Sequence, residues 1–234
     1  MALKLIASDI EKGYNGERVL RACSFAFSEH GIYVLTGSNG CGKSTFLRIC
    51  ALIEVPDGGE VNYFSDDMLL SHDLELKRKI TLVLPKVGVF NSTVFKNVAY
   101  GLWIRGIRGT EAEKYVTEAL EFVGLKHKRE QNALTLSSGE SQRLGIARAM
   151  VIKPHILFLD EPTASVDPKN TEIIEDIVLE MKKDAKTIVV IATHDRAQAQ
   201  RLADCLMVMR EGKITSGQPP FPRPQTRIPG SCIL

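Results

Sequence analysis

The stretch that decides the fold is Gly-Ser-Asn-Gly-Cys-Gly-Lys-Ser-Thr, from Gly37 to Thr45. An apolar run, Ile32 to Leu35, precedes it and a second apolar segment follows it, which predicts the order strand, glycine-rich loop, helix. The glycines permit backbone angles that let successive N–H groups surround phosphate oxygens at a helix N-terminus. Lys43 is expected to reach the β- and γ-phosphates, and Ser44 to place a hydroxyl on Mg²⁺.

The alternative is a glycine turn with a solvated lysine, and the preceding strand and the following Lys-Ser favour the phosphate site over it. The residues predicted to bind phosphate are Gly37, Ser38, Asn39, Gly40, Cys41, Gly42, Lys43, Ser44 and Thr45.

A pair of carboxylates forms the second candidate site. Asp160 and Glu161 come directly after the apolar run Ile156 to Leu159, which is typical of a buried parallel strand. Adjacent carboxylates are often only surface charge, but ligands of α/β sheets bind at the carboxyl ends of such strands. Asp160 is therefore predicted to hold the Mg²⁺ shell, and Glu161 to polarise the water that attacks a phosphoryl group.

The third candidate site is Leu-Ser-Ser-Gly-Glu, from Leu136 to Glu140. Ser137 and Glu140 have the spacing of a capping box, so the segment predicts at least a helix start. The N-terminus of that helix is a second place for an anion. Two such sites in one chain suggest two chains that share nucleotides.

The wider pattern indicates an α/β fold. Short β-like runs before residue 36 predict antiparallel strands, and strands alternate with helices after Pro154, which predicts a mostly parallel core. Helical periodicity from about 87 to 138 predicts an inserted helical subdomain, in which Thr110 and Glu113 have the spacing of a capping box. We expect one domain over 1–216 and an extended Pro-rich tail over 217–234.

Composition narrows the class of protein. The 234 residues are 44% hydrophobic and 25% charged with a net charge of +2, which favours neither a nucleic-acid binder nor a polybasic membrane-surface protein. The five cysteines lack paired C-x-x-C spacing, which indicates reduced thiols in a cytosolic protein. No apolar run approaches the length of a bilayer span, so we expect a soluble chain.

Taken together, the motifs resemble those of the nucleotide-binding subunits of ATP-binding cassette transporters, over about residues 3 to 215. The loop at 37–45 is similar to the family's Walker A loop, Leu136 to Glu140 to its signature, and Leu157 to Pro162 to its Walker B segment. Ser165 to Asp167 resembles the D-loop, and His194 the switch histidine.

The resemblance implies a P-loop NTPase that forms a head-to-tail homodimer around two ATP molecules with Mg²⁺. Lys43, Glu161 and His194 are the implied catalytic residues, and Ser44 and Asp160 the implied Mg²⁺ ligands. The implied nucleotide contacts outside the Walker A loop are Tyr14 and Val19 at the adenine, and Ser137, Ser138, Gly139, Glu140 and Asp167 from the signature and D-loop.

One position departs from the family pattern. The family usually has glutamine at the junction into the helical subdomain, and this chain has Pro85 there, followed by Lys86. Proline offers neither an amide oxygen nor a backbone N–H. Either Lys86 or water takes the place of the glutamine side chain, or the rate of hydrolysis and its coupling to transport differ from the family norm. Ser138, where glycine is commoner, is a milder departure.

The resemblance implies an importer ATPase that works on a separate permease at the inner face of the cell membrane, together with a substrate-binding protein. The segment from Val89 to Leu102 is similar to the corresponding lobe of oxyanion importers, notably the tungstate type. Two alternatives stay open: a cassette ATPase that is not coupled to transport, and a nucleotide-binding module that hydrolyses weakly because of Pro85.

Overall fold

In the described part of the chain, the larger of two β-sheets has six strands and carries the phosphate loop at the carboxyl ends of its parallel strands. The computed structural model describes residues 3–183 and 187–216, and in them the strand order of this sheet is β10-β9-β3-β8-β7-β6. All neighbouring pairs are parallel except β9 and β10. The strands are β3 (Gly31–Thr36), β6 (Ile80–Val83), β7 (Ile156–Asp160), β8 (Ile188–Thr193), β9 (Cys205–Arg210) and β10 (Lys213–Ser216).

The register of the central strands aligns their carboxyl ends. Thr36 of β3 pairs with Thr193 of β8, and Asp160 of β7 pairs with Ala192 of β8. The residues that follow these three strands therefore emerge at one edge of the sheet, where ligands of open α/β sheets bind. This edge brings together the phosphate loop, Glu161 and His194, which lie far apart in the sequence.

The central strands β3, β7 and β8 are largely apolar up to their last residues, Thr36, Asp160 and Thr193, because both faces of the sheet are covered. Val34 of β3 and Leu159 of β7 face an apolar cluster shared with α3 to α6, whereas Leu35 and Phe158 face a second cluster shared with α1 and the antiparallel sheet. Side chains alternate between the faces of a strand, so a strand buried on both sides is mostly apolar on both faces. The all-apolar runs in the sequence are explained by this sandwiching.

The second sheet is antiparallel, with the order β2-β1-β4-β5. Its strands are β1 (Leu3–Tyr14), β2 (Glu17–Phe27), β4 (Gly58–Ser65) and β5 (Met68–Leu69). Asn15 and Gly16, with φ of 50° and 85°, make the two-residue turn between β1 and β2. Tyr14 is the last residue of β1, directly before this turn, so it lies at one end of the antiparallel sheet.

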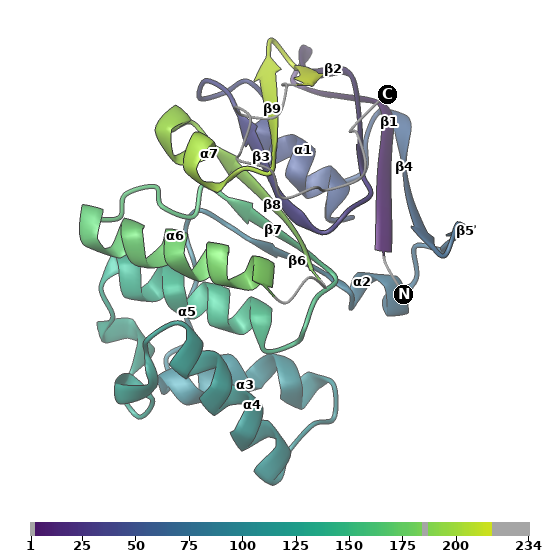
Figure 1. Ribbon diagram of the computed structural model, residues 1–234. Helices are drawn as coiled ribbons and strands as arrows, with labels where there is room; N and C mark the ends of the chain where they lie inside the picture. The colour runs from purple at the N-terminus through teal and green to yellow at the C-terminus, as the bar shows by residue number, and fades with distance from the viewer. Residues whose placement is uncertain (1–2, 184–186, 217–234) are drawn as a thin grey trace.

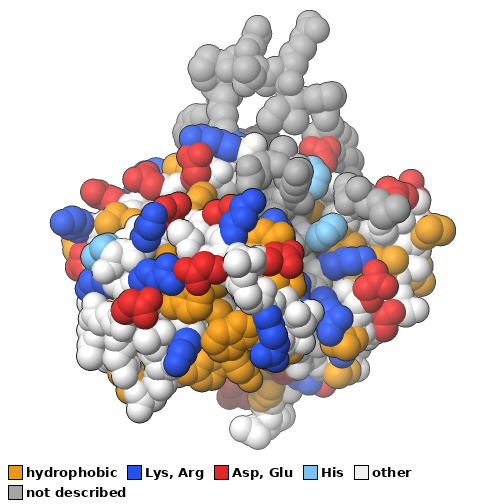
Figure 2. Space-filling view, turned by 90° about the horizontal axis from the view of Figure 1, so that it is seen from below, with side chains coloured by type: hydrophobic (Ala, Val, Ile, Leu, Met, Phe, Trp, Pro, Cys, Tyr) orange, Lys and Arg blue, Asp and Glu red, His pale blue; other side chains and the backbone are white. Residues whose placement is uncertain are grey.

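The helices cover the sheets and form one end of the molecule. They are α1 (Lys43–Cys50), α2 (Leu74–Lys77), α3 (Val94–Ile104), α4 (Gly109–Phe122), α5 (Ser138–Met150), α6 (Pro168–Lys183) and α7 (Arg196–Leu202), with 3-10 turns η1 (Lys126–Lys128) and η2 (Ala133–Thr135). In Figure 1, α3 and α4 lie at the bottom, far from the antiparallel sheet, and α1 lies between the two sheets. The underside in Figure 2 shows hydrophobic side chains gathered among charged ones.

One predicted helix start is wrong. Thr110 and Glu113 do not form a capping box, because α4 begins at Gly109 with Arg108 as its N-cap and no side chain caps it. Thr110 therefore lies inside the first turn, beyond the position from which its hydroxyl could cap the helix. Glu113 instead pairs with Arg129, at 2.7 Å. The predicted tail, 217–234, lies outside the described residues.

Candidate functional site

The loop between β3 and α1 has the shape of an anion cradle. Gly40 and Gly42 have φ of 78° and 110°, a region that side chains disfavour. A β-carbon at Gly37 would lie 2.5 Å from the carbonyl oxygen of Met209, so close packing also requires glycine there. Gly42 is the N-cap of α1 and no side chain caps this helix, which leaves its first N–H groups for another acceptor. Such an end favours an anion.

Lys43 is folded beneath this loop. Its side chain is only 4% exposed, and its ammonium donates to the carbonyl oxygens of Gly37 at 2.9 Å and Ser38 at 3.0 Å. Glu161 Oε1 lies 3.5 Å from the same nitrogen. The cation is thus held at the loop by partners that more negative phosphate oxygens can replace. The loop residues Ser38, Asn39 and Gly40 are exposed, while Cys41 and Thr45 are buried.

Ser44 and Asp160 lie side by side at the end of β7. Ser44 Oγ donates to Asp160 Oδ1 at 2.9 Å, and Asp160 is 2% exposed. Burial raises the pKa of Asp160, and the hydrogen bond from Ser44 only partly opposes this. A divalent cation would stabilise the ionised carboxylate, and hydroxyl and carboxylate oxygens are ligands that Mg²⁺ accepts. The pair therefore fits the predicted Mg²⁺ shell.

The chain itself supplies few ligands to such an ion. Among residues 3–183 and 187–216, no three His, Cys, Asp or Glu side chains gather as a metal site. This agrees with the usual behaviour of Mg²⁺, which keeps waters and binds through one or two protein groups plus the phosphates of a nucleotide.

Glu161 is held between a cation and an imidazole. Its Oε2 lies 3.1 Å from His194 Nδ1, while its Oε1 faces Lys43. Glu161 has φ of 46°, uncommon for a residue with a side chain, and its N–H donates to Ala192 of β8 at 2.9 Å. Such outliers cluster at functional sites. The arrangement aims a carboxylate at the space beside the loop, where it can accept a proton from water.

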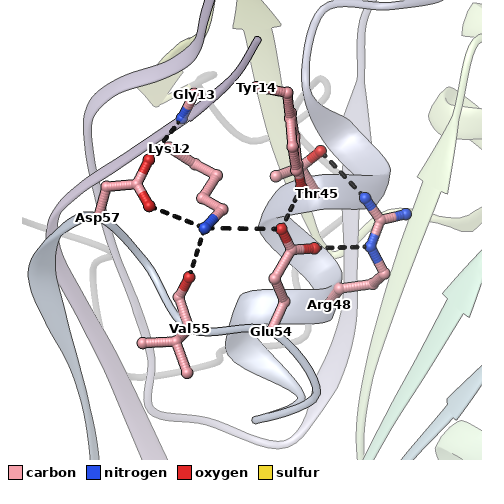
Figure 3. Close-up of polar contacts among 8 residues, drawn as sticks. All are labelled: Lys12, Gly13, Tyr14, Thr45, Arg48, Glu54, Val55 and Asp57. Carbon is pink, nitrogen blue, oxygen red and sulfur yellow. Dashed lines mark hydrogen bonds and ion pairs between the residues drawn. The ribbon is translucent and has the colours of Figure 1, made fainter. Parts of the chain in front are cut away.

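Tyr14 and Val19 flank the loop from the hairpin β1-β2. Tyr14 is 39% exposed and its hydroxyl donates to the carboxylate of Glu54, as Figure 3 shows. The carbonyl oxygen of Val19 lies against Gly42, where an added β-carbon would be 3.1 Å away. Both predicted adenine contacts therefore lie beside α1, whereas Glu54 had no signal in the sequence.

The signature residues lie on a separate surface. Ser137 caps α5 and forms the predicted capping box with Glu140, and Glu140 also pairs with Lys128 at 2.6 Å. Ser137 and Ser138 are exposed, and Ser138 Oγ donates to the carbonyl oxygen of Ser165 at 3.4 Å. Within the part of the chain that the structure describes, no hydrogen bond or ion pair joins this loop to the phosphate loop.

Asp167 has a structural partner in the same chain. Its carboxylate accepts from the backbone N–H of Asn170 at 3.0 Å and from the Asn170 amide at 2.7 Å, which caps the start of α6. The side chain of Asn170 also fills the space at Gly139, where an added β-carbon would lie 2.5 Å from Asn170 Cγ. The D-loop and the signature loop are therefore packed together.

Pro85 lies two residues beyond the end of β6 and is exposed, as is Lys86. Beside them is a cavity of about 280 Å³ between β6, α3 and α5, whose lining includes Lys86, Tyr100 and Arg148. Arg148 donates to the carbonyl oxygen of Gly88 at 2.6 Å and stacks on the ring of Phe90. The sequence pattern did not single out Arg148, because its partners lie about sixty residues away along the chain.

Comparison with known proteins points to one family. The sequence model described as ABC transporter matches residues 20–164. The chain is 37% identical over 212 residues to the tungstate uptake system ATP-binding protein TupC of Peptoclostridium acidaminophilum, an alignment that covers 91% of this chain and 97% of that protein. It is 35% identical over 227 residues to the phosphate import ATP-binding protein PstB 2 of Natronomonas pharaonis, with coverage of 92% and 80%.

A solved structure supports the same grouping. The structure of cbiO1 from Clostridium perfringens, described as part of the ABC transporter complex cbiONQ, superposes with a TM-score of 0.82 at 27% identity. The match covers 92% of this chain and 88% of that one. The predicted α/β P-loop fold, with its parallel core and antiparallel sheet, is confirmed.

Proposed function

Because this chain belongs to the ABC transporter family, whose ATP-binding proteins hydrolyse ATP to drive transport, we propose that it powers the import of an oxyanion through separate permease subunits. The observation that carries the proposal is the cluster at the edge of the parallel sheet. There Lys43, Ser44, Asp160, Glu161 and His194 converge from three strand ends.

The roles of these residues follow from their positions. Lys43 and the loop N–H groups bind and orient the phosphates, and Glu161 accepts a proton from the attacking water. His194, which faces Glu161, orients that carboxylate and contacts the γ-phosphate. Mg²⁺, held by Ser44 and Asp160, would neutralise charge on the phosphates. Phosphoryl transfer needs mainly positioning and charge stabilisation, which is what this set of groups offers.

A second copy of the chain completes the site. Ser138 and Gly139 of one copy approach the γ-phosphate bound by the phosphate loop of the other, so that a head-to-tail dimer encloses two ATP molecules. Two observations support this arrangement: the signature loop is preformed by its capping box, and it is exposed. Since hydrolysis then requires closure of the dimer, it is coupled to motion.

The permease anchors the protein at the cytoplasmic face of the membrane. None of the described helices has both the length and the apolar character of a bilayer span. Exposed apolar side chains on α3, Tyr100 and Ile104, together with Phe90, offer a surface to a partner. A substrate-binding protein is a further expected partner, and a nucleic acid is not expected.

The oxyanion assignment rests on relatives. The tungstate and phosphate proteins named above, and a probable anion import ATP-binding protein of Haloferax volcanii at 34% identity, support it. The glycine betaine/carnitine and spermidine/putrescine transport proteins that match at the same 34% identity carry other cargoes in their names. Identification of the permease in the neighbouring genes, followed by tungstate and phosphate uptake assays, tests the cargo.

Pro85 motivates the second candidate, a nucleotide-binding module that hydrolyses weakly. An ATPase assay of the chain with and without its permease in vesicles separates the two. We expect slow hydrolysis alone and faster hydrolysis with the permease, and membrane association only when the permease is co-expressed. Hydrolysis that the permease leaves unchanged, with membrane association absent, contradicts the transport function.

A further inference from the structure

The hydroxyl of Tyr14 is tethered to a residue from a different part of the chain. It donates to the carboxylate of Glu54, which follows α1 and stands 40 positions later in the sequence. Figure 3 shows the two side chains pointing toward each other between the end of β1 and α1. The Lys12 ammonium also lies over the Tyr14 ring, 5.7 Å from its centroid. The contact with Glu54 holds the hydroxyl end of this half-exposed side chain and so restricts its rotamers.

Glu54 is itself fixed by cations. Arg48 Nε donates to Glu54 Oε2 at 3.0 Å, and Lys12 Nζ lies 3.9 Å from Glu54 Oε1. Burial acts to raise the pKa of Glu54, but the hydrogen bonds from Tyr14 and Arg48 outweigh it, so the pKa lies below its ordinary value. At neutral pH the carboxylate is therefore ionised and can accept from both neighbours.

Arg48 links this carboxylate to the phosphate loop. It lies on α1, and its Nη2 donates to the hydroxyl of Thr45, the last residue of the loop, at 3.3 Å. Thr45 is 6% exposed. The chain of contacts Tyr14, Glu54, Arg48, Thr45 thus connects the hairpin beside the predicted adenine site with the helix that carries the phosphate-binding N–H groups.

A second set of contacts fixes the backbone that bears Tyr14. Lys12 Nζ donates to Asp57 Oδ1 at 2.8 Å and to the carbonyl oxygen of Val55 at 2.9 Å. The N–H of Gly13 donates to Asp57 Oδ2, also at 2.8 Å. The two residues before Tyr14 are therefore attached to the segment that follows α1, which couples the position of the hairpin to that of the helix.

We propose that Glu54, oriented by Arg48, is a positioning residue that holds the Tyr14 ring in the conformation that stacks on the adenine base. The ring is thereby kept at a fixed distance from the phosphate loop. The inference rests on the proposed function, in which Tyr14 stacks on the base. Holding one side chain in its bound rotamer before ligand arrives corresponds to about a 2- to 10-fold gain in affinity.

The test compares a ligand that has a base with one that lacks it. Binding of ATP and of inorganic triphosphate to the full chain is measured by calorimetry for the wild type, Tyr14→Phe, Glu54→Ala and the double variant. We expect each single variant to bind ATP about 2- to 10-fold more weakly and triphosphate as the wild type does. The double variant should lose no more than one single variant, because both remove the same contact.

Two further variants keep the outcomes distinct. Glu113→Gln removes an exposed carboxylate that pairs with Arg129 away from the site, and it should change neither affinity. Tyr14→Ala removes the ring, and it should weaken ATP binding more than Tyr14→Phe does, by about 10-fold or more, again without an effect on triphosphate.

Three results would overturn the inference. Equal weakening of ATP and triphosphate by Glu54→Ala would mean a structural effect through Arg48 and Thr45. Unchanged ATP affinity in Tyr14→Phe and Glu54→Ala, with the loss retained in Tyr14→Ala, would mean that the ring stacks without being held. An unchanged ATP affinity in Tyr14→Ala would remove base stacking itself, and the positioning role with it, while leaving the phosphate site intact.

Discussion

The phosphate-side cluster (Lys43, Ser44, Asp160, Glu161 and His194) and the signature loop (Leu136 to Glu140) differ in how much of a nucleotide site each forms within one chain. At the cluster, Lys43 and Asp160 are buried, Glu161 is half-buried, and each has a partner that follows another strand of the sheet. At the signature loop, Ser137 and Ser138 are exposed and their contacts stay within α5 and the adjacent D-loop. Under the proposed function, the first region is one complete half of the nucleotide site, and the second is a preformed surface that binds the other copy's nucleotide.

The difference shows how hydrolysis can depend on assembly. Charges at the cluster need one another, since a buried charge without a partner is costly, so this half must be built inside the chain. The signature loop needs only a stable helix start, and its capping box supplies one without covering the hydroxyls. In the proposed dimer, such a division keeps nucleotide binding in one copy and reserves catalysis for two.

The largest effect on ATP hydrolysis is expected at the phosphate-side cluster. Lys43→Ala removes the cation nearest the phosphates, so we expect ATP hydrolysis to fall by about 10²- to 10³-fold. A steady-state assay measures this, with Lys79→Ala as the control because Lys79 makes only an exposed pair with Glu75. A rate within twofold of the wild type would remove Lys43 from the catalytic role.

The second-largest effect is expected at the signature loop, and its absence would contradict the difference between the two regions. Ser138→Arg places a bulky charge on the exposed signature surface, so hydrolysis should fall by about 10²-fold while one chain still binds ATP normally. Calorimetry and an ATPase assay measure the two properties, and Ser71→Arg, at another exposed serine, should alter neither. Loss of ATP binding in Ser138→Arg would place the signature loop in the same half-site as Lys43.

Substitution of Pro85 tests whether the permease acts through the junction between β6 and the helical subdomain. Pro85→Gln adds an amide that can accept and donate hydrogen bonds, each typically worth about 0.5–1.5 kcal/mol. We therefore expect turnover with the permease to rise by about 2- to 10-fold and turnover of the chain alone to change little. A rise of the same size in both assays would mean that Pro85 affects chemistry and not coupling.

The smallest effect concerns the stability of the signature loop. Burial acts to raise the pKa of Glu140, but the hydrogen bonds from Lys128 and the Ser137 N–H outweigh it and lower the pKa below its ordinary value of 4.5. Ionised Glu140 therefore stabilises the fold above that value, and the contribution is lost as the pH falls through the lowered pKa. Glu140→Gln should cost about 0.5–1 kcal/mol at pH 7.

Urea unfolding at pH 7 and at steps below pH 4.5 measures this contribution. The difference in unfolding free energy between wild type and Glu140→Gln should shrink toward zero in acid. A difference that stays constant with pH would show that the loop does not depend on the charge of Glu140.

Local sequence patterns predicted most of the fold because short segments of the chain have the hydrophobic pattern of the strand or helix that they form. Apolar runs such as Ile156 to Leu159 are typical of strands covered on both faces, and the residues that follow parallel strands meet at one edge of the sheet. The contact between Tyr14 and Glu54 could not be predicted, since it depends on where the hairpin and α1 pack. The capping box at Thr110 was wrong because the preceding Arg108 and Gly109 already start the helix.

The most direct test of the shared site is the mass of Glu161→Gln in solution with ATP and Mg²⁺. This variant keeps ATP bound because its amide cannot accept the proton from water, so the two halves should stay closed around the nucleotide. We expect a species of twice the 25.9 kDa of one chain with ATP, one chain with ADP, and no dimer when Ser138→Arg is added. A single-chain mass at saturating ATP, or a dimer that Ser138→Arg leaves intact, would contradict the account.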